Sequence, residues 1–301
     1  MFTEKTKKYL SIAGLLYCSL ILGTHYVITQ QLAQSTDPIV LTGYRFLTAA
    51  LPLFAYLLFI KKNPFTKIKP GLVLGFFLWL VFVLIAKGVT YTSASNAGFI
   101  SGAFIVFVPI LSYLFFRNLP KAYHYFVIAL SLLGLYFLTG QLQRINVGDI
   151  MILFSALFTA IHLVSVSRYA KQGLDPVVLC FQQFAVVFAL SFAFALVAGT
   201  NITFPSTQIV PLLFLGLFAT LSAFFVQIIS LKNASEITAA IILALQPVFA
   251  AIFAVLFNNE SITAIQMFGG FLLLAATIIN QVYPSVFRRN AEVLETIPEK
   301  V

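Results

Sequence analysis

The sequence predicts an all-α integral membrane protein whose ten transmembrane helices form two inverted repeats of five helices. Three observations lead to this prediction: the composition, the spacing of the apolar runs and an internal duplication. Of the 301 residues, 60% are hydrophobic and 9% are charged, and the mean hydropathy is +1.00. A water-soluble domain carries about a quarter of charged residues, so lipid must be the solvent of this chain. The composition therefore excludes a soluble enzyme, an extracellular disulfide module and a disordered protein.

The basic residues give the chain a net charge of +9, but their distribution does not fit nucleic-acid binding. They occur in small groups between the apolar runs, without a stripe along one face or interleaved aromatic residues. This distribution is typical of the cytoplasmic loops of a membrane protein. Cys18 and Cys180 both lie inside apolar runs, so no disulfide framework is expected.

Ten apolar runs are long enough to cross a bilayer core of about 30 Å, which takes roughly 20 residues of helix. In order along the chain they are 9–32, 39–60, 71–91, 94–116, 122–140, 147–169, 176–198, 208–231, 235–257 and 262–283. The first run follows a basic start, and it is expected to be retained because it is longer than the apolar part of a signal peptide and lacks a small-x-small cleavage site. Proline, asparagine, glycine or charge marks most of the short connections between runs, at Asp37-Pro38, Asn63-Pro64, Lys69-Pro70, Asn118 to Pro120, Gly173 to Pro176 and Asn258-Asn259.

The loop charges predict the orientation of the chain in the membrane. With the N-terminus inside, 15 of the 18 Lys and Arg residues lie on the inner side. Only Lys87 and Arg144 lie on the outer side, while Arg45 falls within the second run near its outer end. Positive charge concentrates on the cytoplasmic side of membrane proteins. Both termini, and with them the tail 284–301, are therefore expected in the cytoplasm, and the chain in the plasma (inner) membrane.

An internal duplication divides the chain into two similar halves. The segment 37–46 (DPIVLTGYRF) and the segment 175–184 (DPVVLCFQQF) are identical at five of ten positions, at an offset of 138. Pro109 and Pro247 fall at the same offset inside the fourth and ninth runs. The repeats are expected to span 1–140 and 141–283. Since each repeat holds an odd number of spans, the second enters the membrane upside down, an arrangement that suits alternating access, with an inert scaffold as the alternative.

Two segments resemble a known family of membrane proteins. They are similar to the two helix-starting signatures of the EamA-type drug/metabolite transporter superfamily. The first is Thr92 to Pro109 (TSASNAGFISGAFIVFVP), and the second is Asn233 to Pro247 (NASEITAAIILALQP). The ten-span layout and Arg45 fit this family too. The resemblance implies a ten-helix transporter with a central cavity lined mainly by spans 1, 3, 4, 6, 8 and 9. Two positions depart from it: Gly23 to Tyr26 replace an aromatic residue, often Trp, and Arg45 is matched by Gln183 in the second repeat.

Polar groups within the hydrocarbon layer are costly and normally face the interior of the bundle, so they are the candidate site residues. His25 and His162 lie 12 and 13 residues before the paired aspartates, which makes them near-equivalents. Imidazole can donate and accept hydrogen bonds and titrates near neutral pH, so we expect substrate contact or proton coupling at these positions, with satisfaction by a neighbouring helix as the alternative. The expected substrate-binding residues are His25, Tyr26, Trp79, Asn96, Ser101, His162, Ser222, Gln227, Thr238 and Gln246.

Pro109 in span 4 and Pro247 in span 9 are expected to be bending points for gating. Pro109 and Pro247 each leave a carbonyl free in mid-helix and can bend it. Asn96 and Thr238 align with each other at the helix starts. Because 13 residues separate Asn96 from Pro109 but only nine separate Thr238 from Pro247, the first repeat is expected to have about one extra helical turn, and the cavity to be asymmetric.

Several other side chains have two possible roles each. Trp79, the only Trp, lies near the middle of its span, where it can stack on a substrate or pack in the core. Lys87 can attract anions into an outer vestibule or snorkel to the interface. Arg45 is expected to reach the interface or cap helix carbonyls, with anion binding as the minor alternative. The 33 Phe residues are taken mostly as lipid-facing bulk, without a site.

The predicted function is secondary transport of small organic metabolites such as amino acids, by alternating access. The alternatives are an uptake permease for a nucleoside-like or vitamin-like compound, of the S-adenosylmethionine or riboflavin type, and a non-transporting receptor or scaffold. The spacings required of intramembrane proteases, lipid-phosphate transferases, metal sites and ion channels do not occur. No enzyme activity, cofactor, metal or nucleic-acid partner is expected. The expected partners are a small-molecule substrate and the lipid bilayer, with proton coupling open because no carboxylate lies inside a span, and no oligomer is required.

Overall fold

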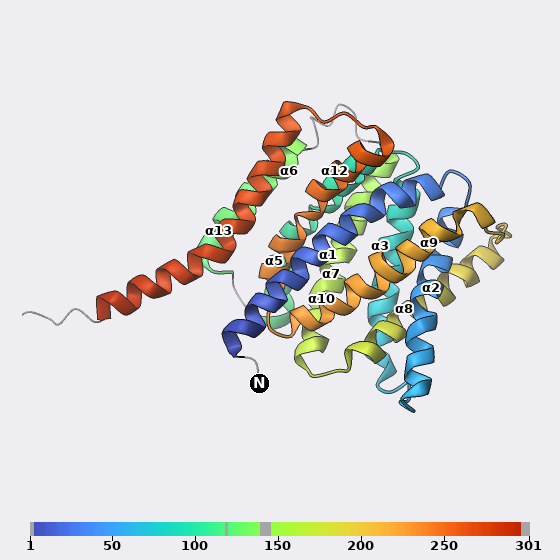
Figure 1. The fold of residues 1–301 in the computed structure, drawn as a ribbon, viewed down its shortest axis with the longest axis horizontal. Coiled ribbons are helices and arrows are strands. Elements are labelled where there is room, and N and C mark those ends of the chain that lie inside the picture. Colours follow the sequence, from blue (N-terminus) through green and yellow to red (C-terminus); the bar gives the residue numbers. More distant parts are fainter. Residues whose placement is uncertain (1–2, 118–119, 139–145, 296–301) are drawn as a thin grey trace, which may run out of the picture.

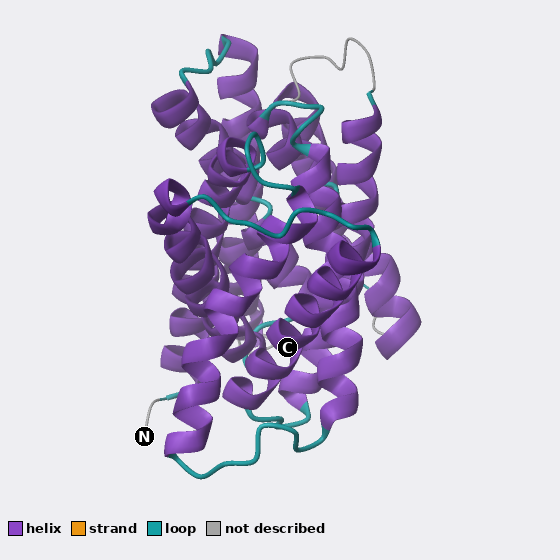
Figure 2. Ribbon diagram, turned by 90° about the vertical axis from the view of Figure 1, so that its right-hand side faces the viewer, coloured by secondary structure: helices purple, strands orange, loops and turns teal. Residues whose placement is uncertain are grey.

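The protein is a bundle of helices joined by short connections (Figure 1, Figure 2). The structure, a computed structural model, describes residues 3–117, 120–138 and 146–295, and it contains no strand in these ranges. The first half comprises α1 (Glu4–Leu32), α2 (Pro38–Phe59), α3 (Ile68–Gly88), α4 (Ala94–Ser101), α5 (Phe104–Phe116) and α6 (Ala122–Leu138). The second half comprises α7 (Val147–Lys171), α8 (Pro176–Val197), η1 (Ser206–Gln208), α9 (Ile209–Gly216), η2 (Leu217–Ser222), α10 (Ala223–Leu231), α11 (Glu236–Leu243), α12 (Gln246–Asn258) and α13 (Ala264–Glu295).

The described residues provide nine helical spans that are long and apolar enough to cross a membrane, together with the shorter apolar helix α6. These ten elements match the ten predicted runs to within three residues at the described ends, with two exceptions. Helix α1 begins at Glu4, whereas the predicted run begins at residue 9. Helix α13 continues to Glu295, well beyond the predicted end at 283. Arg144 and the predicted boundary at 140 and 141 lie outside the described residues.

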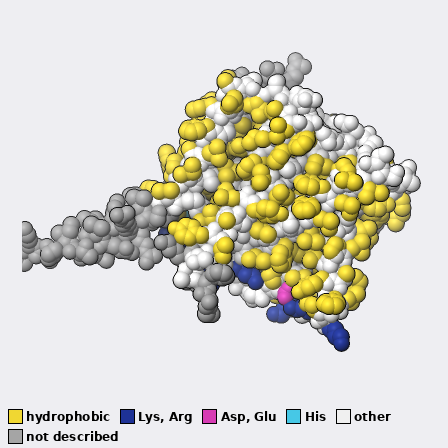
Figure 3. All heavy atoms as spheres, viewed as in Figure 1, with side chains coloured by type: hydrophobic (Ala, Val, Ile, Leu, Met, Phe, Trp, Pro, Cys, Tyr) yellow, Lys and Arg dark blue, Asp and Glu magenta, His cyan; other side chains and the backbone are white. Residues whose placement is uncertain are grey.

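The outer surface of the bundle is apolar, as a lipid-facing surface must be. Figure 3 shows hydrophobic side chains over most of one face, with Lys and Arg side chains gathered at one end. Large apolar residues such as Phe59 and Val197 are almost fully exposed on the surface of the bundle. We call the end where α2 and α7 end and α8 begins, with Lys62 and Lys171, the basic end, and the other end of the bundle the opposite end.

The two halves are inverted relative to each other, as predicted. Helices α2 and α8 occupy the same place in their halves, and they pack antiparallel: Lys62, just after α2, pairs with Asp175, just before α8. Helices α6 and α13 also correspond, and Tyr123 at the start of α6 stacks on Tyr283 late in α13, with ring centroids 4.9 Å apart. Corresponding helices therefore run in opposite directions through the membrane.

The other helix contacts made by elements of one half are repeated by the equivalent elements of the other half. Helix α1 packs on α10 and α12, and its counterpart α7 packs on α3 and α5. Helix α4 packs on α12, and its counterpart α11 packs on α5. Such reciprocal packing is what a pseudo-two-fold axis in the membrane plane requires.

The expectation of an extra turn in the first half is wrong. Helices α4 and α11 have eight residues each, and α5 and α12 have 13 each. The offset between matching helix starts is 138 at α2 and α8 but 142 at α4 and α11, so the second half holds four more residues between these points. They lie in the region of α9, η2 and α10, where η2 is a π-helix. Pro109 and Pro247 are therefore not equivalent, because their shared offset ignores this insertion.

Candidate functional site

Spans 4 and 9 are both broken near their middle, and the breaks lie beside the central cavity. Between α4 and α5, the backbone N–H groups of Gly102 and Ala103 donate to Phe99 and Ile100, each at 3.0 Å and each three residues back. Between α11 and α12, the N–H of Leu245 donates to Ile242 at 3.1 Å in the same way. These tighter turns separate each span into two helices and leave backbone groups without regular helical partners. Breaks at membrane depth occur in transporters where they line a cavity.

Pro247 is the second residue of α12 and so lies next to one break, whereas Pro109 lies five residues beyond the start of α5. Gating at these two prolines stays a prediction.

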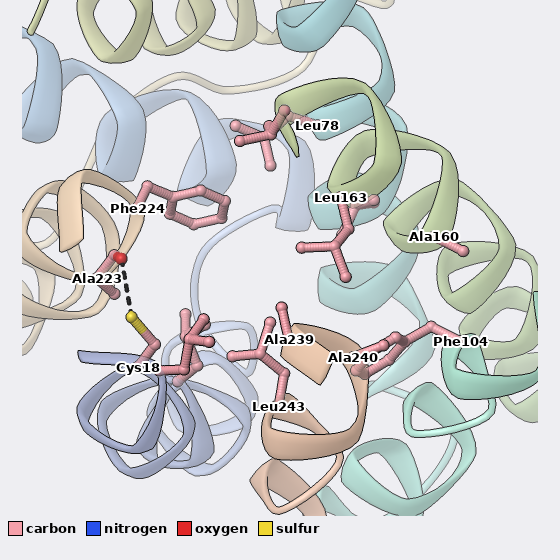
Figure 4. Close-up of a cluster of buried hydrophobic side chains, with 14 of the residues drawn as sticks. Cys18, Leu78, Phe104, Ala160, Leu163, Ala223, Phe224, Ala239, Ala240 and Leu243 are labelled. Atoms are coloured by element: carbon pink, nitrogen blue, oxygen red, sulfur yellow. Dashed lines mark hydrogen bonds between the residues drawn. The ribbon is translucent and has the colours of Figure 1, made fainter. Parts of the chain in front are cut away.

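The cavity lies between the two halves and is lined by spans 1, 3, 4, 6, 8 and 9, the set that the family resemblance implies. About 560 Å³ between the lining side chains holds no protein atom, its opening included. The cavity proper measures about 50 Å³, which is smaller than most small-molecule sites. Figure 4 shows part of the wall, where Leu78, Leu163 and Phe224 come from separate helices. The lining residues are Leu22, His25, Tyr26, Leu78, Val81, Phe82, Ile85, Ser101, Phe104, Thr159, His162, Leu163, Phe224, Gln227, Leu243 and Gln246.

Fourteen of these sixteen side chains form seven pairs of equivalent positions in the two halves. Two pairs keep the same residue type, namely His25 with His162 and Phe82 with Phe224. In each of the other five pairs one member is polar and the other apolar. These pairs are Leu22 with Thr159, Tyr26 with Leu163, Ile85 with Gln227, Ser101 with Leu243 and Phe104 with Gln246. The residue numbers of a pair differ by 137 between α1 and α7 and by 142 in all the other pairs. The cavity is therefore nearly symmetric in backbone position but asymmetric in chemistry.

The two histidines lie in equivalent positions but have different partners. The His25 side chain is 2% exposed and stacks on Tyr26, with ring centroids 4.0 Å apart, and its Nδ1 has no hydrogen-bond partner among the described residues. The His162 side chain is 3% exposed, and its Nε2 donates to Oε1 of Gln183 at 2.9 Å. A buried imidazole nitrogen without a partner is costly unless a ligand satisfies it.

Hydroxyl and amide groups complete the polar part of the lining. The hydroxyl groups of Tyr26 and Ser101 form a hydrogen bond that joins α1 to α4, and Ser101 Oγ also lies 2.8 Å from the carbonyl of Gly98. From the second half, Thr159, Gln227 and Gln246 line the same space. This combination of apolar rings with a few placed donors and acceptors is typical of small-molecule sites.

Six of the ten predicted site residues line the cavity, and four lie elsewhere. The lining contains His25, Tyr26, Ser101, His162, Gln227 and Gln246. Trp79 instead packs between Phe76 and Phe194, on a face of α3 turned away from the cavity. The hydroxyl of Ser222 forms a hydrogen bond with the hydroxyl of Tyr17, and the two oxygens are 2.6 Å apart. Asn96 and Thr238 belong to the first turns of α4 and α11, where their backbone N–H groups donate to Ser93 and Ser235, and so lie near the ends of the bundle.

Four further polar or aromatic side chains of the lining, Thr159, Phe82, Phe104 and Phe224, are not among the residues that the sequence predicts. Thr159 lies one helical turn before His162, a spacing that could have indicated it. The phenylalanines gave no such signal, because the same residue covers the lipid-facing surface.

Hydrogen bonds join the helices around the cavity at the opposite end. The Gln30 amide donates to the carbonyls of Val89 and Thr92, at 3.3 Å and 3.0 Å, and its oxygen accepts from Asn258 at 2.9 Å. The Ser95 hydroxyl donates to the Glu260 carboxylate. The end of α1, the start of α4 and the end of α12 are thus held together.

At the basic end the counterpart elements are held together by a carboxylate. Glu236, the first residue of α11, is 3% exposed. It accepts hydrogen bonds from Ser112 of α5 at 2.7 Å, and from Ser167 and Lys171 of α7 at 3.1 Å and 2.8 Å. The equivalent elements of the two halves therefore close the two ends. Among the described residues, only the basic end has an ion pair in this place, between the buried Glu236 and the partly exposed Lys171.

A second ion pair at the basic end joins Lys62 to Asp175. Burial alone would raise the pKa of Asp175, but the hydrogen bonds from Lys62 and from the backbone amides of Val178 and Val177 more than offset it and hold the pKa below its usual value. The Asp175 carboxylate is therefore ionised at neutral pH, and its contribution to stability is lost only as the pH falls through this lowered pKa.

Arg45 is buried near the cavity, with a side chain 2% exposed. Its Nε donates to the Thr220 hydroxyl at 2.7 Å, and its Nη2 donates to the Ala219 carbonyl at 2.9 Å. Both acceptors belong to the π-helix η2, where helical bonding is irregular. This contact agrees with the expected capping of helix carbonyls. Lys87 is exposed at the end of α3, as snorkelling requires.

Cys18 and Cys180 are both free and buried, and the Cys18 thiol donates to the carbonyl of Ala223 at 3.1 Å (Figure 4). In the part of the chain that the structure describes, no group of three or more His, Cys, Asp or Glu residues is placed to hold a metal ion.

Two inverted halves, two broken spans and a cavity between them define a polytopic membrane transporter of the inverted-repeat class. The comparisons with known proteins agree. The model of the EamA-like transporter family matches residues 10–140 and 146–281. The chain belongs to the EamA-like transporter family.

Relatives of the chain are named only as transporters, without a substrate. An uncharacterized transporter of Archaeoglobus fulgidus is 33% identical over 276 residues, which cover 92% of this chain and 87% of that protein. The uncharacterized transporter YoaV of Bacillus subtilis is 22% identical over 279 residues, 89% of this chain and 95% of its own. A solved crystal structure shares the fold, with a TM-score of 0.76 over 93% of this chain and 98% of that one, at 13% sequence identity.

Proposed function

We propose that the protein moves small organic metabolites, such as amino acids, across the membrane by alternating access, and that the central cavity is the solute site. The observation that supports this most is the cavity of paired residues, with bonds at each end made by the same three elements. If the halves exchange conformations, the bonds of one end form while those of the other break, and the cavity opens to alternate sides. Phe82 and Phe224 can flank a planar group, so nucleoside-like and vitamin-like compounds remain the second candidate class.

The proposal is tested first by a solute screen. A metabolite panel that includes amino acids, nucleosides and vitamins is added to the purified protein, and ligands are detected by a rise in the thermal unfolding temperature. Each ligand is then tested for uptake into proteoliposomes. We expect at least one small organic ligand to be carried. If no compound is bound or moved, a receptor or scaffold function replaces transport.

The histidines supply the second test. We expect His25→Ala and His162→Ala to lower transport by about tenfold or more, because each removes a polar group from the cavity at a cost of roughly 1–3 kcal/mol. His124→Ala is the matched control, since His124 lies in α6 outside the cavity lining. Normal transport by both cavity variants, with all three proteins inserted equally, would contradict a role for the imidazoles.

The lining contains two imidazoles and no carboxylate among the described residues, so any proton exchange with the solute path would occur at His25 or His162. A pH jump across proteoliposomes tests this coupling. Accumulation driven by the jump, and lost in both histidine variants, supports proton-coupled transport. Transport that ignores the proton gradient identifies a facilitator.

We further propose that the basic end faces the cytoplasm of the inner membrane, because positive charge favours that side. Gln34 and Gln172 are exposed and lie just after α1 and α7, at opposite ends of the bundle. In a background without Cys18 and Cys180, a cysteine at position 34 should react with an impermeant thiol reagent from the periplasmic side, and a cysteine at 172 only from the cytoplasmic side. Labelling of both from one side would contradict the inverted topology.

A further inference from the structure

We propose that the cavity selects solutes that carry a carboxylate, and that Arg45 is the residue that sets this preference. The inference rests on the proposed transport function and names the charge class of the solute. It starts from a buried guanidinium that lies one ring away from the cavity and has only neutral hydrogen-bond acceptors.

The charge of Arg45 is not neutralised within the protein. No carboxylate of the described residues lies within ion-pair distance of it. Its acceptors are the Thr220 hydroxyl and the Ala219 carbonyl. Taking a charge out of water is expensive unless an opposite charge compensates it, and lipid makes the cost larger. The positive charge of Arg45 is therefore not compensated by a negative charge among the described residues.

The charge lies close enough to act on a bound solute. The Arg45 Cζ is 4.3 Å from the centroid of the Phe82 ring, and Phe82 lines the cavity. The His25 ring lies 5.6 Å from the same ring. In a poorly screened interior, a positive charge at this range attracts a carboxylate in the cavity.

His25 gives a second observation at the same place. Its side chain lines the cavity, and its Nδ1 has no partner among the described residues. An imidazole N–H that faces a carboxylate forms a charge-assisted hydrogen bond, which is stronger than a neutral one. We therefore place the carboxylate of the solute on the His25 side of the cavity.

The second half provides an internal comparison. Gln183 occupies the position equivalent to Arg45, and it bonds to His162 as a neutral partner. The positive charge is thus present on one side of the cavity only. The amides of Gln227 and Gln246 and the hydroxyl of Thr159 lie on the side of the second half, where they can take up the rest of the solute, including the amine of a zwitterion.

The test compares carboxylates with their neutral or amidated analogues. The probe pairs are benzoate with benzamide and phenylalanine with phenylalaninamide, measured by thermal shift and by competition against the uptake of a carried solute. For the unaltered protein we expect the carboxylate of each pair to bind at least about tenfold more tightly. Equal binding within both pairs overturns the inference.

Three variants assign the preference to Arg45. Arg45→Gln installs the residue that the second half uses, and it should reduce the ratio within each pair to near one. Arg45→Lys keeps the charge and should keep the preference. Gln183→Leu alters the equivalent position without changing any charge and should also keep it. An unchanged ratio in Arg45→Gln, or a loss in Gln183→Leu of the same size, overturns the inference.

A fourth variant covers the case in which Arg45→Gln does not fold, since Arg45 also holds η2. Thr220→Asp keeps the arginine and places a carboxylate where its Nε now donates at 2.7 Å. It should remove the preference by neutralising the charge from within; a preserved ratio in a folded Thr220→Asp protein counts against the inference. If the screen finds no carried solute, the transport function fails; if solutes are carried without a charge preference, only this inference fails.

Discussion

Tyr26 and Ser101 join α1 to α4 through their hydroxyl groups, at the level where the fourth span breaks. Their equivalents in the second half, Leu163 and Leu243, cannot form such a bond. The bond therefore ties one broken span to its neighbour on one side of the cavity only. Any opening that separates α1 from α4 must break it.

We expect Tyr26→Phe to lower the apparent affinity or rate of transport by about fivefold, because it removes one hydrogen bond worth roughly 1 kcal/mol and keeps the ring that stacks on His25. Tyr17→Phe is the matched control. It removes the same kind of hydroxyl pair, with Ser222, outside the cavity lining. Equal losses in uptake for the two variants would show that the Tyr26 hydroxyl has no special role.

For single residues, the sequence predicts how far along its span a side chain lies better than it predicts which way around the helix that side chain points. His25, His162 and Gln227 could be found because a polar side chain in lipid must turn inward. Trp79 lies at the expected depth, but a single Trp does not indicate which way around the helix it points. Phe82 and Phe224 could not be separated from lipid-facing phenylalanines, since both environments are apolar.

Helices α6 and α13 approach closely enough to bring their backbones into contact. A Cβ atom added to Gly269 would lie 2.6 Å from the Gly134 carbonyl oxygen and 2.6 Å from the backbone nitrogen of Leu138. A backbone atom cannot move aside as a flexible side chain can. Small residues at such crossings are typical of helix packing in membranes.

Gly269→Ala should therefore push α6 and α13 apart and lower the thermal unfolding temperature in detergent, with an expected cost of about 1–3 kcal/mol. The adjacent Gly270→Ala is the control, because its added Cβ would find its nearest neighbour at 3.8 Å, an ordinary contact. If both variants unfold at the same temperature as the unaltered protein, the close crossing is not needed for stability.

The elements themselves could be predicted closely, because a membrane span requires a long apolar run and its ends require polar residues. The register between the repeats could not. Two prolines at one offset suggested equivalence, but four additional residues around η2 shift everything after them. An insertion that a π-helix accommodates leaves the apolar pattern intact, so the sequence gives no sign of it.

On the scale of the whole molecule, the proposed alternating access would require the bonds at the two ends of the cavity to form and break in turn. Glu236 at the basic end bonds to α5 and α7, and Glu260 at the opposite end bonds to Ser95 of α4. Glu236 is buried, and Lys171, its ionic partner, is 41% exposed and can return to water when the pair breaks.

We expect Glu236→Gln to weaken the basic end, because a hydrogen bond to a charged group is worth more than a neutral one, and to shift the population toward states open there by several-fold. The readout is thiol labelling of a cysteine placed at Thr159 of the lining, in a background without Cys18 and Cys180, from each face of the membrane. Glu260→Gln is the counterpart control and should raise labelling from the other face. Increased labelling from the same face in both variants would contradict the assignment of these bonds to opposite ends.

The mismatched pairs of the cavity have a consequence for the energetics of the transport cycle. Two identical halves related by a two-fold rotation would make the states open to either side degenerate, so neither would be favoured at rest. Here five lining pairs differ in polarity, and Glu236 corresponds to Ala94 at the start of α4. In the proposed cycle these differences lift the degeneracy. A small set of side chains would then determine the resting orientation, and single substitutions could change it while the scaffold stays the same.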